Sequence, residues 1–248
     1  MTTLVMEDNS SIFVIKSFRK LIVPKETQAS ESLYLGTILA ISGGFMDAYT
    51  YICRGQVFAN AQTGNIVLLG VNLSEGRWLM ALRYLPPVLA FISGILISDW
   101  VRYQYKRISC SIHWRQIVIL IEALTFMVVG FFPQSLNLLA NSLVSLACGI
   151  QVESFRKIHG NSVATTMCIG NLRAAVEAFT EFLYFRTPGA GKRTGFYGGM
   201  IVAFAVGSVL GNYFVRFWRE RAIFVSCFLM IIGFLLMFVW KSEHVQST

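Results

Sequence analysis

Long apolar stretches separated by short polar ones run along the chain from about residue 33 to residue 240. Several of them approach the roughly 20 residues that an α-helix needs to cross the core of a bilayer. The pattern predicts eight apolar helical segments, at 33–53, 57–73, 84–103, 116–132, 138–155, 162–185, 196–217 and 222–240. Between six and eight of these segments are expected to span the membrane, because the second and sixth would either cross it or re-enter.

The composition supports the same class of fold. Hydrophobic residues make up 55% of the 248 residues and charged residues 14%, against roughly 25% charged residues in soluble domains. The mean hydropathy is +0.59. These values predict an all-α, polytopic membrane helix bundle. Residues 32–248 would form a single membrane domain, and the tail at 1–31 is either an amphipathic helix on the membrane surface or disordered.

The net charge of +8 would suggest a nucleic-acid partner if the chain were soluble. The lysines and arginines instead lie mainly between the apolar segments, where the positive-inside rule places them. They form no basic domain interleaved with aromatic residues. We therefore expect the lipid bilayer, and no nucleic acid, as the partner of this surface.

The first apolar segments recur later in the chain. Adding 106 to the residue number pairs Gly43 with Gly149, Asp47 with Glu153, Gly64 with Gly170 and Asn65 with Asn171. The third and seventh segments, and the fourth and eighth, also carry similar sequences in the same order. The chain is therefore predicted to contain two tandem four-segment repeats, at 32–133 and 137–240.

Basic residues predict the orientation of these repeats. The stretches 102–115 and 216–221 are strongly basic and occupy equivalent places, so both are expected on the cytoplasmic side. If all eight segments span the bilayer, the two repeats are parallel and both termini lie outside. Re-entry of the second or sixth segment would change this topology.

Asp47 is the leading candidate for a functional residue, because a carboxylate inside a bilayer is costly unless it is paired, protonated or beside water. The preceding Gly43 and Gly44 allow close helix approach. Polar residues in the next segment are expected to break that helix halfway and to line a cavity, as discontinuous helices do in transporters. These residues are Gln62, Thr63, Gly64 and Asn65.

Glu153 is expected to join Asp47 in this site, with Gly149, Gly170 and Asn171 supplying the equivalent elements from the second repeat. Two nearby carboxylates resist joint ionisation, so one of them would carry a proton. In the alternative interpretation, these polar residues only form hydrogen bonds between helices and hold the bundle together.

Glu122 and Arg173 are further candidates for substrate or proton binding. Glu122 is a lone acid in the fourth segment, and it is either a proton-relay carboxylate or the partner of Arg173. Arg173, Glu177 and Glu181 are spaced four residues apart on one helix face, which favours a salt-bridged stripe over contact with an anionic solute.

The chain carries no motif of a known enzyme class. It contains no P-loop, HExxH or GxSxG sequence. Its five cysteines form no CxxC pair, and its three histidines have no metal-ligand spacing. We expect no catalysis, no metal and no cofactor.

The sequence GGFMDAYTY, followed by QTGNIVLLG and by Pro86, Gly94 and a Thr-Thr-x-x-x-Gly-Asn echo at 165–171, resembles the YoaK-like family of small bacterial membrane proteins. The resemblance covers nearly the whole chain from about residue 33. It implies a multi-pass protein of the bacterial inner (plasma) membrane, of uncharacterised function. Cys168 and Ile169 stand where the first copy has Gln62 and Thr63, which predicts an asymmetric site.

Two hypotheses about function follow. The first is a secondary transporter or permease for a small polar solute, with or without proton coupling. The second is a non-transporting scaffold, sensor or partner subunit whose polar residues are structural. Glycine-rich faces on the third and seventh segments suit either internal packing or a homodimer.

Overall fold

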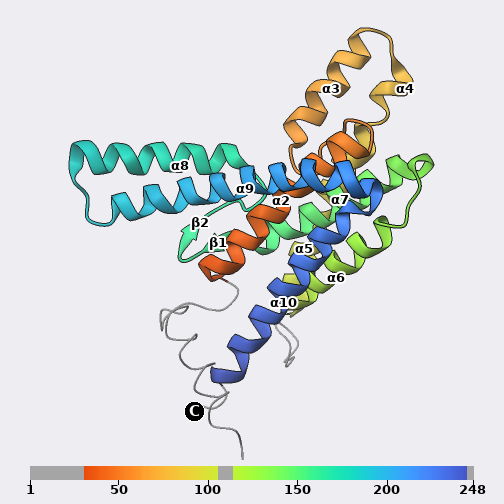
Figure 1. The fold of residues 1–248 in the computed structure, drawn as a ribbon. Coiled ribbons are helices and arrows are strands. Elements are labelled where there is room, and N and C mark those ends of the chain that lie inside the picture. Colours follow the sequence, from red (N-terminus) through yellow and green to blue (C-terminus); the bar gives the residue numbers. More distant parts are fainter. Residues whose placement is uncertain (1–30, 106–113, 245–248) are drawn as a thin grey trace, which may run out of the picture.

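The protein is described here by a computed structural model, which covers residues 31–105 and 114–244 and consists mainly of α-helices (Figure 1). The surface helix proposed for the tail lies outside these residues. The main helices are α2 (Leu33–Cys53), α3 (Gln62–Ser74), α4 (Trp78–Ala81), α5 (Leu85–Tyr105), α6 (Trp114–Val129), α7 (Asn137–Ser154), α8 (Cys168–Thr180), α9 (Ala190–Trp218) and α10 (Phe224–His244). The short elements are η2 (Gln134–Leu136), β1 (Lys157–Ile158), β2 (Asn161–Ser162), η3 (Glu181–Phe185) and η4 (Arg219–Ile223).

Helix α2 defines the two ends of the helix bundle. Just before its first residue, Glu31 forms an ion pair with Arg115 at 3.5 Å; we call this the Glu31 end. Just after its last residue, Arg54 donates a hydrogen bond to the carbonyl oxygen of Phe132 at 2.9 Å; we call this the Arg54 end. Because α2 is a continuous helix of 21 residues, the two ends lie about 30 Å apart.

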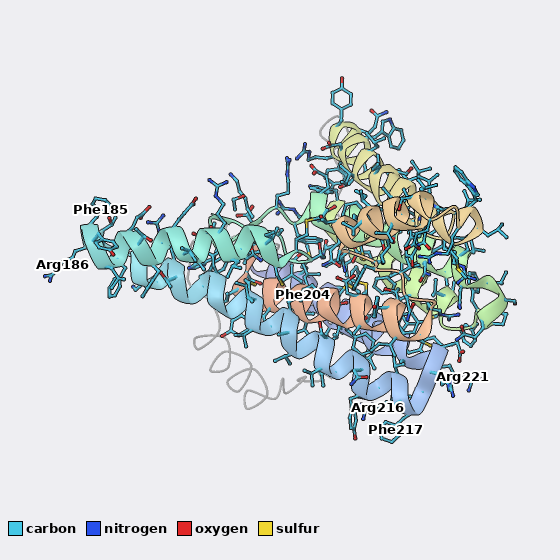
Figure 2. The ribbon with its side chains drawn as sticks, turned by 90° about the horizontal axis from the view of Figure 1, so that it is seen from above. Phe185, Arg186, Phe204, Arg216, Phe217 and Arg221 are labelled. Atoms are coloured by element: carbon cyan, nitrogen blue, oxygen red, sulfur yellow. The ribbon has the colours of Figure 1, made fainter. Side chains whose placement is uncertain are left out.

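Glycines bring α2 and α9 into backbone contact. A Cβ atom at Gly44 would overlap the carbonyl oxygen of Phe204, and a Cβ atom at Gly207 would overlap that of Ile41. The long α9 therefore crosses α2 near the middle of both helices. In Figure 2, Phe204 is labelled at this crossing.

Helices α5 and α7 make the same contact in the other half of the bundle. A Cβ atom at Gly149 would overlap the carbonyl oxygen of Phe91, and one at Gly94 would overlap that of Leu146. Gly149 and Leu146 lie 105 positions after Gly44 and Ile41. Each pair thus joins a helix from the first half of the chain to one from the second half.

The two 13-residue helices α3 and α8 begin in the interior of the bundle. The chain leaves α2 at the Arg54 end and turns back, so that Asn60 donates through its side-chain amide to the carbonyl oxygen of Gly43, halfway along α2, at 3.1 Å. The second half places Thr166 against the same glycine, since a Cβ at Gly43 would lie 3.2 Å from the Cα of Thr166. Both helices then project away from the crossing point (Figure 1).

An all-α membrane helix bundle is confirmed, whereas eight spanning segments are not. Length and hydropathy identify three stretches within the described residues that could cross a membrane: Trp78–Tyr105, Gln134–Ser154 and Ala190–Met237. Helices α3 and α8 start several residues later than predicted. Helix α3 is about 20 Å long, which is short of the roughly 30 Å core of a bilayer, and α8 continues into η3 and packs against α9. The predicted break is also displaced, because residues 62–65 form the first turn of α3 and the irregular backbone precedes them.

The prediction that both basic stretches lie on one side of the membrane is wrong. Arg115, at the end of the stretch 102–115, lies at the Glu31 end. The stretch 216–221 lies at the Arg54 end, where the hydroxyl of Tyr49 donates to the carbonyl oxygen of Glu220 at 2.9 Å. The two basic stretches therefore lie at opposite ends of the bundle, and the two tandem repeats stay a prediction.

Gly207→Ala is expected to lower the free energy of unfolding by about 1–3 kcal/mol, because the added methyl group overlaps the backbone of α2. Gly199→Ala in the same helix is the matched control, since a Cβ there meets no atom within 4 Å and alanine favours helix over glycine by about 1 kcal/mol. Thermal unfolding in detergent should show a lower midpoint only for Gly207→Ala. Equal midpoints for the two variants would contradict the close contact.

Candidate functional site

A cavity of about 530 Å³ lies where α2, the starts of α3 and α8, and the middle of α9 meet. Both halves of the chain contribute to it. Its polar lining residues are Asp47, Tyr51, Asn60, Gln62, Thr63, Thr166, Cys168 and Ser208. Its apolar lining residues are Ala48, Ile52, Phe58, Ala61, Met167, Ile169 and Phe204.

Asp47 provides the only ionisable acid among the lining residues, and no lysine, arginine or histidine joins it there. Its Oδ1 accepts hydrogen bonds from the backbone N–H groups of Asn60 at 2.7 Å and Ala61 at 3.4 Å. Ala61 is the N-cap of α3 and supplies no side-chain cap. The carboxylate of Asp47 therefore takes the place of a capping side chain and lies at the positive end of the α3 dipole.

Asn65 braces the backbone that enters α3. Its Oδ1 accepts from the N–H of Phe58 at 2.9 Å, and its Nδ2 donates to the carbonyl oxygen of Phe58 at 2.7 Å and to Oε1 of Gln62 at 2.9 Å. One buried amide side chain thus satisfies both backbone groups of a residue seven positions earlier, in a region where water is scarce.

Asn171 makes the same brace in the second half. Its Oδ1 accepts from the N–H of Ala164 at 3.3 Å, and its Nδ2 donates to the carbonyl oxygen of Ala164 at 2.8 Å. The two asparagines therefore act alike, each on the residue seven positions earlier. Because it is turned toward this loop, Asn171 leaves the N-terminal N–H groups of α8 without a side-chain cap.

Two side-chain oxygen atoms of residues that line the cavity are buried without a hydrogen-bond partner. Thr166 and Asn60 are each 1% exposed, and Oγ1 of Thr166 and Oδ1 of Asn60 have no partner. A buried polar atom without a partner costs about 1–3 kcal/mol. Thr166 and Asn60 both line the cavity, beside α8 and α3 respectively, and these two oxygen atoms are enclosed within its wall.

The remaining predicted residues of the first half lie at or beside the cavity. Gln62 and Thr63 line it, and Gln62 also donates from Nε2 to the carbonyl oxygen of Ala59 at 2.7 Å. Gly64 faces the ring of Phe58, where a Cβ would lie 2.9 Å from a ring carbon. Gly43 admits the backbone of Thr166, as described above.

The two predicted glycines of the second half differ in their surroundings. Gly149 contacts α5, as described above, and a Cβ at Gly170 would meet no atom within 4 Å.

The expected pairing of Asp47 with Glu153 is wrong. Glu153 does not line the cavity; it lies near the C-terminal end of α7 and forms ion pairs with Arg156 at 3.3 Å and Arg102 at 3.7 Å. The glycine contacts explain the error. They match Gly44 with Gly149, which is an offset of 105 residues and not 106. At that offset the residue equivalent to Asp47 is Val152, and not Glu153. The 106-residue offset holds only after the loop, for Asn65 and Asn171.

Glu122 and Arg173 do not meet either. Glu122 on α6 is fully buried, and neither carboxylate oxygen has a hydrogen-bond partner. The side chain of Arg173 is 82% exposed and forms an ion pair with Glu177 at 2.8 Å, while Glu181 pairs with Arg193. The helix-face interpretation of Arg173 and Glu177 is confirmed, and neither Glu122 nor Arg173 lines the cavity.

Sequence reasoning missed Thr166 and Ser208 as cavity residues and did not assign Asn60 a role. Ser208 donates to the carbonyl oxygen of Gly44 at 3.1 Å, across the α2–α9 contact. Thr166 lies two residues before α8, inside the predicted segment 162–185, so the sequence carried no signal that set it apart. Among the described residues, no group of three histidine, cysteine or acidic side chains could hold a metal ion.

Three comparisons with known proteins bear on this site. The chain matches, over residues 35–236, the family described as "Protein of unknown function (DUF1275)". It is 23% identical over 166 residues to the UPF0700 transmembrane protein YoaK of Bacillus subtilis (strain 168), which covers 64% of this chain and 72% of that protein. No solved structure matches the chain. The resemblance to a YoaK-like family is confirmed.

Asn65→Asp is expected to destabilise the protein by about 1–3 kcal/mol, because the carboxylate cannot donate to the carbonyl oxygen of Phe58 and leaves it unpartnered. Asn161→Asp is the control, since Asn161 makes only an exposed bond to the carbonyl oxygen of His159. Thermal unfolding of both variants measures the difference. A change at Asn65 no larger than that at Asn161 would show that the brace contributes little.

Proposed function

Because the chain belongs to the DUF1275 family, and a relative is a transmembrane protein, we propose that it is a secondary transporter of a small polar solute in the bacterial inner membrane. The absence of an enzymatic activity stays a prediction. The proposal keeps the site suggested by the sequence around Asp47, and it replaces Glu153 with groups at the start of α8.

One observation carries the proposal: two short helices begin at the same cavity, one from each half of the chain. Transporters place discontinuous helices near the middle of the membrane, at the interface between repeats, so that helix ends and free backbone groups can bind the solute. Irregular backbone at that depth is tolerated only where protein buries it or where it lines a cavity. The stretches before α3 and α8 meet both conditions.

We propose that the two repeats are inverted, with α2, α5 and α6 crossing the membrane in the first and α7, α9 and α10 in the second. The matching glycine contacts of α2 with α9 and of α7 with α5 support this arrangement. Helices α3 and α8 are then re-entrant. Inverted repeats suit alternating access, because a cavity at their interface can open to either side as one repeat moves against the other.

The distribution of charge supports a cytoplasmic Glu31 end. Among the described residues, Arg102, Arg115, Arg156 and Lys157 lie there. The stretch 216–221 at the Arg54 end carries three arginines and one glutamate (Figure 2). The positive-inside rule therefore favours termini that face the cytoplasm, in contrast to the sequence-based expectation of outside termini.

Asp47→Asn is expected to abolish solute flux into proteoliposomes, with the protein still folded, because the amide keeps the shape of the carboxylate and loses its charge. Asp99→Asn is the control, since Asp99 lies outside the cavity in an exposed ion pair with Arg102. Flux is measured for solutes that raise the unfolding temperature of the wild type. Unchanged flux in Asp47→Asn, with only a lower unfolding temperature, would favour the scaffold or sensor hypothesis.

The proposed topology predicts opposite labelling of two cysteines with a membrane-impermeant maleimide. In a cysteine-free variant carrying Lys157→Cys, an exposed position at the Glu31 end, labelling is expected only after the membrane is disrupted. In a cysteine-free variant carrying Arg221→Cys, labelling is expected in intact spheroplasts. Labelling of both positions from the same side would overturn the inverted arrangement.

A further inference from the structure

We propose that the cavity binds a small zwitterion, with its ammonium group at Asp47 and its carboxylate group at the N-terminal end of α8. This inference rests on the proposed function, because it names the substrate class of the same site. It follows from the charges around the cavity, from the unused polar atoms in its wall and from its apolar surface.

The N-terminal, positive end of α3 has an acidic partner, whereas that of α8 has none. The dipole of α3 is offset by Asp47, which accepts the N–H groups of Asn60 and Ala61. Helix α8 has no acidic residue in its first turn and no side-chain cap. Its leading N–H groups and its partial positive charge therefore remain available to an anionic group.

A second observation marks the α8 end as a binding position. Oγ1 of Thr166 is buried, has no hydrogen-bond partner and belongs to the cavity wall, two residues before α8. A hydroxyl can donate to a carboxylate oxygen beside the helix N–H groups. The carboxylate of a bound solute would thus satisfy the hydroxyl and the helix end together.

The opposite side of the cavity requires a positive group. Asp47 is the single ionisable acid in the lining, and no basic side chain lies there to balance it. Oδ1 of Asn60, also without a partner, is a second acceptor on this side. An ammonium group, which carries three donors and no acceptor, matches both oxygens.

The charges around the cavity favour a zwitterion over a solute that carries only a carboxylate or only an amine. A lone carboxylate would lie in a cavity of low dielectric with the carboxylate of Asp47, and a lone amine would face the positive end of α8. A zwitterion has favourable partners at both ends and no net charge. Apolar side chains such as Ile52, Met167 and Phe204 suit a solute with an apolar body.

The test uses two matched sets of probes on the purified full-length protein. One set is leucine, 4-methylpentanoate and 3-methylbutylamine; the other is 6-aminohexanoate, hexanoate and hexylamine, in which the charges lie farther apart. Dissociation constants are measured by calorimetry and by thermal shift. At least one zwitterion should bind about ten-fold or more tightly than its own carboxylate and amine, which is about 1.4 kcal/mol. Equal binding within both sets, or no binding by either zwitterion, overturns the proposal.

Two variants separate the ends of the site. Asp47→Asn should reverse the preference within the set, so that the carboxylate binds more tightly than the zwitterion. Thr166→Val should weaken binding of the zwitterion several-fold and leave the preference for an ammonium group intact. Thr125→Val, on α6 and away from the cavity, is the control for loss of a threonine hydroxyl. A uniform loss of binding in both cavity variants would contradict the assignment of the two ends.

Failure of this inference can be told from failure of the proposed function. Asp47-dependent flux of another solute, with no binding by the zwitterions, would overturn the substrate class and leave transport standing. Tight zwitterion binding without flux in proteoliposomes would overturn transport and leave the binding site standing.

Discussion

Backbone polar groups inside a bilayer must find their partners within the protein, because no water is present to supply them. The stretches that lead into α3 and α8 face this constraint most directly. Asn65 and Asn171 meet it with the same pair of hydrogen bonds, to Phe58 and to Ala164. The braces hold irregular backbone at the centre of the bundle, and in doing so they bring two helix ends to one cavity.

One buried and one partly buried arginine contact backbone carbonyl groups at the two ends of the bundle. Arg54 is 1% exposed and donates to the carbonyl oxygens of Val129 and Phe132 at the end of α6, where a helix dipole favours a cation. Arg115 donates to the carbonyl oxygen of Ser154 at the end of α7. Neither arginine lines the cavity. Asp47 is therefore the one acidic or basic side chain among the lining residues.

The cavity is symmetric in backbone and asymmetric in charge. The glycine contacts and the asparagine braces occur in both halves. Asp47 has its equivalent in Val152, so only the first half supplies a carboxylate. Similar backbone contacts in the two halves, with a carboxylate in only one of them, give a site with two chemically different ends, which is the basis of the zwitterion proposal.

The sequence by itself predicted the apolar helices and singled out Asp47, because apolar segment length and an acid within an apolar segment are local properties. It predicted Asn65 and Asn171 as contacts of a solute, whereas the structure turns both toward the backbone and neither lines the cavity. Gln62, Thr63 and the Asn65–Asn171 equivalence also followed from local sequence. Only the tertiary structure decided which groups meet Asp47, since a one-residue difference in offset moves Glu153 out of the site. It also decided at which end of the bundle each basic stretch lies, because loop charge does not reveal whether a short helix crosses or turns back. Thr166 became a candidate for the same reason, since neither its position just before α8 nor its burial beside Gly43 was visible in the sequence.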